Sequence, residues 1–291
     1  MRKLIFVFTM CILLLTLALI LFDKYKDEDK EEVAYSIKSS YAYLSNNGEV
    51  NFDVKVYTNH KNSLLKYACS SIANIHNKSN DIVVNVSILD VYQLSNTTYS
   101  DENYYEYCLE LKVMINELNI NDGYLTLNFT NKAYTFYLGS IDIKENIYKD
   151  NELKIVDLYG VSSKDDISLA GIVVTINNES DQNIKITDII IGDDFNVILD
   201  TKYITEVKES VYIEDYLTDD INNDAYLLIE ANCKQTFILP IKYSNDYYLY
   251  NCYLIICGDD FTYLLSNYNY INSNDLEGLE DYLFKGMIYD I

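Results

Sequence analysis

The chain has 291 residues, of which 49% are hydrophobic and 23% are charged. This composition is sufficient for a buried core, so it excludes a wholly disordered chain. The net charge of −23 excludes nucleic acid as a partner, because phosphates and an acidic surface repel one another. The charge is concentrated in residues 151–291, where 8 Lys stand against 26 Asp and Glu, a balance of −18.

An apolar run, Leu4–Phe22, predicts where the protein resides. As a helix, its nineteen residues would span about 28 Å, close to the hydrocarbon thickness of a bilayer. The run ends in bulky residues, where a cleaved signal peptide needs small ones. Cys11 lies inside the run and follows Met10, which does not fit a lipoprotein signal. We therefore expect residues 1–22 to be a transmembrane signal anchor, with a cleaved signal as the alternative.

The charges that flank this run bear on orientation. Arg2 and Lys3 precede it, and Lys24, Lys26 and Lys30 follow it, so the positive charges are nearly balanced. A three-residue head before a long body is typical of a signal anchor. The expected localisation is the cell membrane, single-pass, with the body extracytoplasmic. A cytoplasmic body is the alternative.

Residues 23–32, DKYKDEDKEE, predict a charged stalk, and residues 33–150 predict a β-rich domain. The dominant signal in this domain is an apolar residue at every second position, which is typical of half-buried strands. The strand candidates are Glu49–Tyr57, Tyr105–Ile115, Asp122–Thr130 and Ala133–Leu138, the last two joined by a turn at Asn131-Lys132.

One segment of this domain, Asn62–Asn77, has helical periodicity instead. Apolar residues lie at offsets 0, 3, 4, 7 and 10, which is the spacing of an amphipathic helix. These residues are Leu65, Ala68, Cys69, Ile72 and Ile75. Asn62 or Ser63 can cap the start. We expect one helix here, packed on the sheet.

Residues 151–291 predict a second, acidic β-rich domain. Short strands alternate with turns, which is typical of a β-sandwich. The strand candidates are Ile167–Asn177, Ile184–Ile191, Phe195–Leu199, Tyr226–Glu230, Thr236–Tyr243, Tyr248–Cys257 and Phe261–Leu265. Pro240 lies inside one candidate, which should therefore be an edge strand or carry a bulge. The order of turns resembles that of the Ig-like modules of bacterial surface proteins, without a shared motif.

The tail, Asn274–Ile288, has the pattern of a helix. Asn274 and Glu277 resemble a capping box, and Leu276, Leu279 and Leu283 share one face. The fold class is therefore mainly β: an N-terminal transmembrane anchor followed by two β-rich, sandwich-like domains, the first with one packed helix and the second with a C-terminal helix.

Five cysteines follow the apolar run, and an odd number cannot all pair within one chain. Cys69 with Cys108, and Cys233 with Cys252 or Cys257, could form bridges in an exported body. Buried free thiols are the equal alternative. The absence of a C-x-x-C or Cys/His cluster argues against structural zinc.

The sequence offers little catalytic chemistry. Its two histidines, His60 and His76, lie near the two ends of the predicted helix, about 24 Å apart, and would not share a site. Carboxylate pairs such as Glu106/Glu110 and Asp193/Asp194 could serve a glycosidase in principle, but 45 acids make such pairs common by chance. We therefore expect no enzyme, no catalytic residue and no organic cofactor.

Calcium is the one ion that the sequence makes plausible. Residues 220–224 match the first positions of an EF-hand loop, but Ala225 stands where that loop needs Gly and Ala231 where it needs Glu. An EF-hand is rejected. A looser calcium site on a loop remains, with ligands from Asp219, Asp220, Asn222 and Asp224. A solvated acidic turn is the alternative.

The function expected from these features is non-catalytic binding or scaffolding at the cell envelope, through an unidentified envelope protein or a basic ligand. Sandwich edges and loops suit recognition, and the catalytic constellations are missing. The membrane partner is engaged through residues 4–22. The alternatives are a cation-dependent adhesive or structural module and a hydrolase that uses carboxylates alone.

Overall fold

A computed structural model describes residues 12–16, 30–79, 81–146, 153–165, 169–192, 195–197, 202–204, 212–215, 227–243, 247–258, 262–271 and 280–291. The chain is mainly β, as the alternating sequence pattern predicts. Residues 12–16 are helical. Among the residues described, no helix has both the length and the apolar character needed to cross a membrane.

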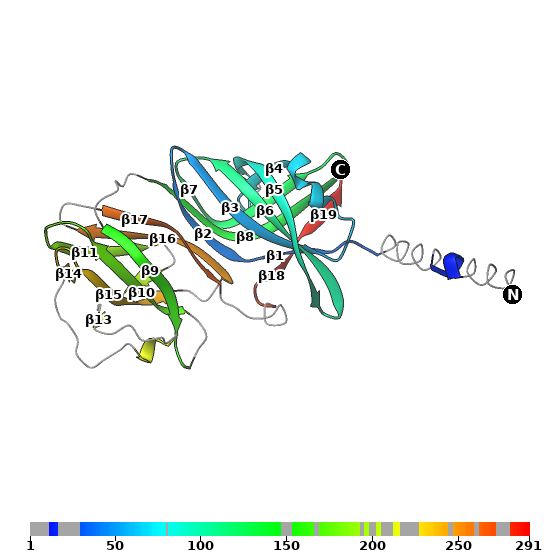
Figure 1. Cartoon of the computed structure of the whole chain (residues 1–291). Coiled ribbons are helices and arrows are strands. Elements are labelled where there is room, and N and C mark those ends of the chain that lie inside the picture. Colours follow the sequence, from blue (N-terminus) through cyan, green and yellow to red (C-terminus); the bar gives the residue numbers. More distant parts are fainter. Residues whose placement is uncertain are drawn as a thin grey trace.

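The N-terminal body is one strongly curled sheet (Figure 1). The strand order is β2-β8-β7-β4-β5-β6-β3-β1. The bounds are β1 Ala34–Ile37, β2 Ser39–Ser45, β3 Glu49–Thr58, β4 Ile72–His76, β5 Ile82–Tyr99, β6 Glu102–Met114, β7 Leu118–Asn128 and β8 Lys132–Glu145. The apolar residues of these strands meet in a single core that draws on every strand from β1 to β8.

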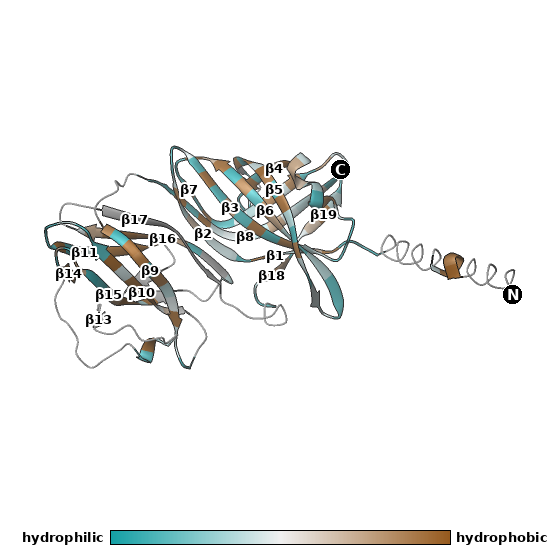
Figure 2. Ribbon diagram, in the orientation of Figure 1, coloured by the Kyte–Doolittle hydropathy of each residue, from teal (hydrophilic) through white to brown (hydrophobic). Residues whose placement is uncertain are grey.

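Strand β3 shows why the sequence adopts this structure. Val50, Phe52, Val54 and Val56 are at most 4% exposed, whereas the residues between them face outward. Successive side chains of a strand point to opposite faces, so an alternating sequence gives one buried face. Figure 2 shows the corresponding alternation of hydrophobic and hydrophilic residues along β3.

The predicted hairpin at Asn131-Lys132 is confirmed. Strands β7 and β8 are antiparallel, and the amide of Phe129 donates to the carbonyl of Lys132 at 2.9 Å. Gly139 interrupts the ladder with φ +102°, and a Cβ there would lie 2.2 Å from the carbonyl oxygen of Ser39. Glycine is therefore required where β2 begins to pair with β8.

The C-terminal body consists of two sheets that face each other. One sheet joins β9 Leu153–Ser162, β10 Leu169–Asn178, β12 Phe195–Val197, β13 Lys202–Ile204 and β15 Lys234–Tyr243. The facing strands are β11 Ile184–Ile191, β14 Leu227–Ile229, β16 Leu249–Gly258 and β17 Thr262–Ile271. A second core cluster takes its buried residues from both layers, Ile172 and Phe237 on one side and Ile189 and Leu254 on the other.

Pro240 sits at a gap in this sheet. It pairs with Gly171 of β10 on one side. On the other side, β13 pairs with residues 236–238 and β12 with residues 241–243, so neither of these strands reaches Pro240. β15 therefore has neighbours on both sides and is not the edge strand that Pro240 predicts, but no described residue of β12 or β13 pairs with this proline, which has no amide hydrogen to donate.

The two bodies are joined by backbone pairing. β16 runs parallel to β2, with Leu249 opposite Ser39, so the large sheet continues from one body into the other. The predicted boundary at residues 150 and 151 lies outside the described residues. The last strands, β18 Leu283–Lys285 and β19 Met287–Asp290, pair with β1 and β8 of the N-terminal body.

The helix predicted over Asn62–Asn77 is wrong in its second half. A 3-10 helix covers Leu64–Ser70, capped by Ser63, whose hydroxyl accepts from the amide of Leu65 at 3.1 Å. Leu65 and Ala68 are buried, as the stripe predicts. Beyond Ser71 the chain becomes β4, which pairs with both β5 and β7. Two ladders of backbone hydrogen bonds outweigh the helical spacing, and Ile72 is left 73% exposed.

The C-terminal helix is also wrong where the structure describes it. Residues 283–290 form β18 and β19 instead, and residues 274–279 of the predicted helix lie outside the described residues. Leu283, predicted to lie on a helix face, packs in a cluster with Ile37, Tyr57 and Tyr104. The free edges of β1 and β8 provide strand partners that local periodicity does not reveal.

Candidate functional site

The calcium ligands predicted from the sequence, Asp219, Asp220, Asn222 and Asp224, lie outside the residues that the structure describes. In the part of the chain that is described, no three His, Cys, Asp or Glu side chains form a group that could hold a metal ion. The structure therefore does not place the predicted site.

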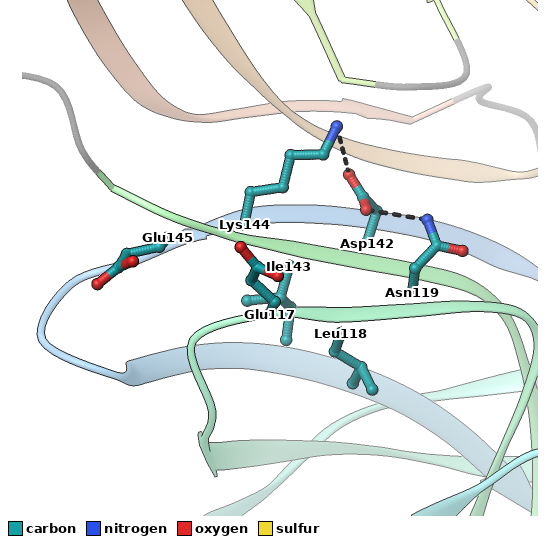
Figure 3. Close-up of a pocket in the computed structure, with 7 residues that line it drawn as sticks. All are labelled: Glu117, Leu118, Asn119, Asp142, Ile143, Lys144 and Glu145. Carbon is teal, nitrogen blue, oxygen red and sulfur yellow. Dashed lines mark hydrogen bonds and ion pairs between the residues drawn. The ribbon is translucent and has the colours of Figure 1, made fainter.

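An open pocket of about 500 Å³ lies where β7 begins and β8 ends (Figure 3). Its lining residues come from two adjacent segments: Glu117, Leu118, Asn119, Asp142, Ile143, Lys144 and Glu145. Leu118 is directly opposite Ile143 in the ladder, and Asn119 is opposite Asp142. Alternation puts Leu118 and Ile143 in the core, where they are 6% and 1% exposed, and leaves the polar residues between them on the outer face.

Asp142 is the buried polar centre of this pocket, at 8% exposure. Its Oδ1 accepts from Asn119 Nδ2 at 3.1 Å. Its Oδ2 lies 3.5 Å from Lys144 Nζ and accepts from the hydroxyl of Tyr253 at 3.4 Å. Tyr253 belongs to β16, so Asp142 connects the pocket to the C-terminal body. These contacts satisfy the buried carboxylate and hold it in place.

The exposed rim of the pocket is negatively charged, and a ligand would meet these charges first. Glu117 and Glu145 are exposed, and Asn116 donates to Glu145 Oε1 at 3.5 Å. Three carboxylates and one ammonium give the lining a formal charge of −2. The lining contains no His, Cys, Ser or Tyr, so the groups that it offers for chemistry are its carboxylates and the ammonium of Lys144. The arrangement suits binding of a cationic group.

The structure places several of the other residues that the sequence offers as catalytic candidates. Glu106 forms an ion pair with Lys55 at 3.0 Å and accepts from Ser95 Oγ at 2.7 Å. His60 Nε2 lies 3.1 Å from the carbonyl of Lys30. His76 is buried in β4, with Nε2 2.9 Å from Thr126 Oγ1 and its ring stacked on Tyr124. Asp193 and Asp194 lie outside the described residues.

In this structure no disulfide bond joins the five cysteines after the apolar run, so neither of the bridges that the sequence leaves possible, Cys69 with Cys108 and Cys233 with Cys252 or Cys257, is formed. Cys108 and Cys252 are buried, and burial raises the pKa of these thiols to about 11 and about 12. Such thiols stay protonated and behave as small apolar residues.

Sequence reasoning missed the pocket. The signal that could have indicated it is Asp142, an acid that stands between Ile141 and Ile143 near the end of strand β8. A comparison of the chain with protein-family models and with curated proteins finds no match.

Proposed function

We propose that the protein is a non-catalytic binding or scaffolding protein of the cell envelope. The observation that carries this proposal is the pocket at the β7 and β8 ends, which is open, is lined by three carboxylates and one ammonium, and presents Glu117 and Glu145 on its exposed rim. A basic side chain of a partner protein fits this chemistry, since an exposed carboxylate pair attracts a cation while the buried Asp142 stays fixed by its own bonds.

The proposal includes a membrane anchor. It rests on the apolar run Leu4–Phe22, whose length matches a bilayer, and places the body on the extracytoplasmic side. The anchored body would present the pocket to proteins of the envelope. The strong negative charge of the chain supports a basic partner by steering it toward the surface.

Affinity capture from detergent-solubilised envelope extract tests the proposal, with the full-length chain as bait. The test variant combines Glu117→Gln with Glu145→Gln, which removes two rim charges and keeps the side-chain shapes. The matched control combines Glu280→Gln with Asp281→Asn, two exposed acids outside the pocket. We expect a basic protein to be captured by the wild type and the control and lost with the test variant.

The outcomes separate the parts of this proposal. Equal capture by all three proteins would show that the pocket is not the contact. No specific capture by the wild type would contradict a binding function at the envelope.

A further inference from the structure

The C-terminal strands close a seam in the curled sheet of the N-terminal body. β18 is antiparallel to β1, with Tyr35 opposite Lys285, and β19 is antiparallel to β8, with Thr135 opposite Met287. The segment thus lies between two strands that do not pair with each other along this stretch. Figure 1 shows β18 and β19, in red, beside β1 and β8.

The change of partner takes place at Gly286. Its amide donates to the carbonyl of Ala34 at 2.8 Å, the last bond to the β1 side. A Cβ at this position would lie 3.1 Å from two ring atoms of Phe136 and 3.3 Å from the carbonyl oxygen of Thr135. Glycine lets the backbone pass close to β8, so the segment is fitted to this seam.

Backbone pairing rather than side-chain burial holds the segment. Phe284, Met287 and Tyr289 are 39%, 55% and 46% exposed. The side chains make contacts as well: Leu283 packs in the cluster of Ile37, Tyr57 and Tyr104. The ring centroids of Phe284 and Tyr137 lie 4.5 Å apart, and the Tyr289 hydroxyl is 2.6 Å from Thr135 Oγ1. Only Ile288 of this strand packs against the main core.

Two open edges would be left without this segment. β1 pairs with β3 on its other side, and β8 there pairs with β7, so residues 35–37 and 132–135 would present unpaired amides and carbonyls. Such edges accept another extended chain of suitable sequence. Residues 283–290 have such a sequence, since they already pair with both edges.

We propose that this seam exchanges its closing strand with a second copy of the chain, giving a strand-swapped dimer. Every contact of residues 283–290 would be reproduced, because the two copies have the same sequence. Eight residues separate Ile271 from Glu280, enough chain to span about 27 Å when extended.

The net charge of the chain predicts how the exchange depends on ionic strength. Two copies with a net charge of −23 repel one another, so the monomer is favoured at low salt. Added salt screens the repulsion between exposed charges and leaves the backbone bonds of the seam intact. The dimer should therefore increase with both protein concentration and ionic strength. This inference does not depend on the pocket or its ligand.

Trapping by disulfides tests the exchange in the full-length chain. One chain carries Tyr35→Cys and the other carries Lys285→Cys, both with Cys69→Ser, because Cys69 is the exposed native thiol. The two chains are mixed in detergent at high salt, partly unfolded with urea, returned to native conditions and oxidised. Position 35 is opposite position 285 in the ladder, so a linked dimer requires the strand of one copy on β1 of the other.

The control mixture replaces Lys285→Cys with Met114→Cys, an exposed position on β6 opposite Glu49 and outside the seam. A linked dimer in the first mixture and none in the control is the expected result. A chain that carries both Tyr35→Cys and Lys285→Cys shows the pairing within one molecule. An internal link there, without a linked dimer in the first mixture, would overturn the proposal. If neither the first mixture nor the doubly substituted chain forms a link, the pairing of β18 with β1 is contradicted.

Discussion

Glu32 and Lys132 form an ion pair at 2.9 Å that fastens the start of the N-terminal body to the β7–β8 turn. The Glu32 side chain is 7% exposed, and its Oε2 also accepts from the hydroxyl of Tyr134 at 2.9 Å. Beside it, Asn59 donates to the carbonyl of Glu31 and accepts from the amide of Val33. The last residues of the predicted stalk therefore contact the body directly.

Replacing Glu32→Gln should destabilise the body by about 2 kcal/mol, because Lys132 and Tyr134 would lose a charged acceptor in a largely buried place. Urea unfolding followed by tyrosine fluorescence measures this change, since the chain has 30 Tyr and no Trp. The control is Glu102→Gln. Glu102 pairs with Lys30 at a similar distance, but both side chains are about 40% exposed, so its loss should have little effect. Equal effects would contradict the role given to Glu32.

The same pair predicts a pH dependence. Burial acts to raise the pKa of Glu32, but hydrogen bonds with Ser63, Lys132 and Tyr134 outweigh it and hold the pKa below its ordinary value of 4.5. A carboxyl with a lowered folded pKa stabilises the fold above its unfolded pKa and loses this effect as the pH falls through the folded pKa. The stability difference between wild type and Glu32→Gln should be constant from pH 6 to 8 and shrink below about pH 4.5.

Unfolding at several pH values, in dilute solution because the pI is about 4.3, checks this prediction. A difference that stays constant down to pH 3 would show that folding does not lower the pKa of Glu32.

Sequence reasoning recovers structure where one face of a strand is buried. Alternation identifies β3 and β6, and the turn at Asn131-Lys132 identifies the β7–β8 hairpin. It missed β5, because irregularities between Ile88 and Asp90 and between Gln93 and Asn96 break the two-residue period. The strand exists because β6 pairs with it from Val86 to Tyr99 and β4 pairs with its start, and neither pairing is a local property.

The pocket could not be predicted for a related reason. Asp142 takes one of its partners, Tyr253, from 111 residues further along the chain. No spacing rule joins two such positions. The acids that the sequence made prominent, residues 219–224, are neighbours in one segment and could be recognised only as a local cluster.

Limited proteolysis tests the predicted orientation. Lys30 is paired with Glu102, so trypsin should cut after Lys24 or Lys26 and release a body that begins at Tyr25 or Asp27. Intact cells with the body outside should yield this fragment, and a Lys24→Gln, Lys26→Gln variant should resist cleavage there. Protection until the cells are lysed would place the body in the cytoplasm. A body in the medium without protease would indicate a cleaved signal.

The calcium hypothesis concerns Asp219, Asp220, Asn222 and Asp224, and its test should use the full-length chain. Strands of the C-terminal half pair with β2, β1 and β8, so a fragment that begins near residue 152 would lose those partners. If the loop binds calcium, millimolar calcium should raise the melting temperature, since a ligand of the native state stabilises it by mass action. Sodium at the same ionic strength should not reproduce the shift, because screening acts on all exposed charges alike.

A variant with Asp220→Asn and Asp224→Asn separates a site from a general charge effect. It should lose the calcium-specific part of the shift while its response to sodium stays that of the wild type. The matched control is Glu280→Gln with Asp281→Asn, which changes the net charge by the same amount at exposed positions of the tail. Equal effects of sodium and calcium on the wild type would leave the acidic segment as a solvated turn, and the cation-dependent adhesive alternative would lose its support.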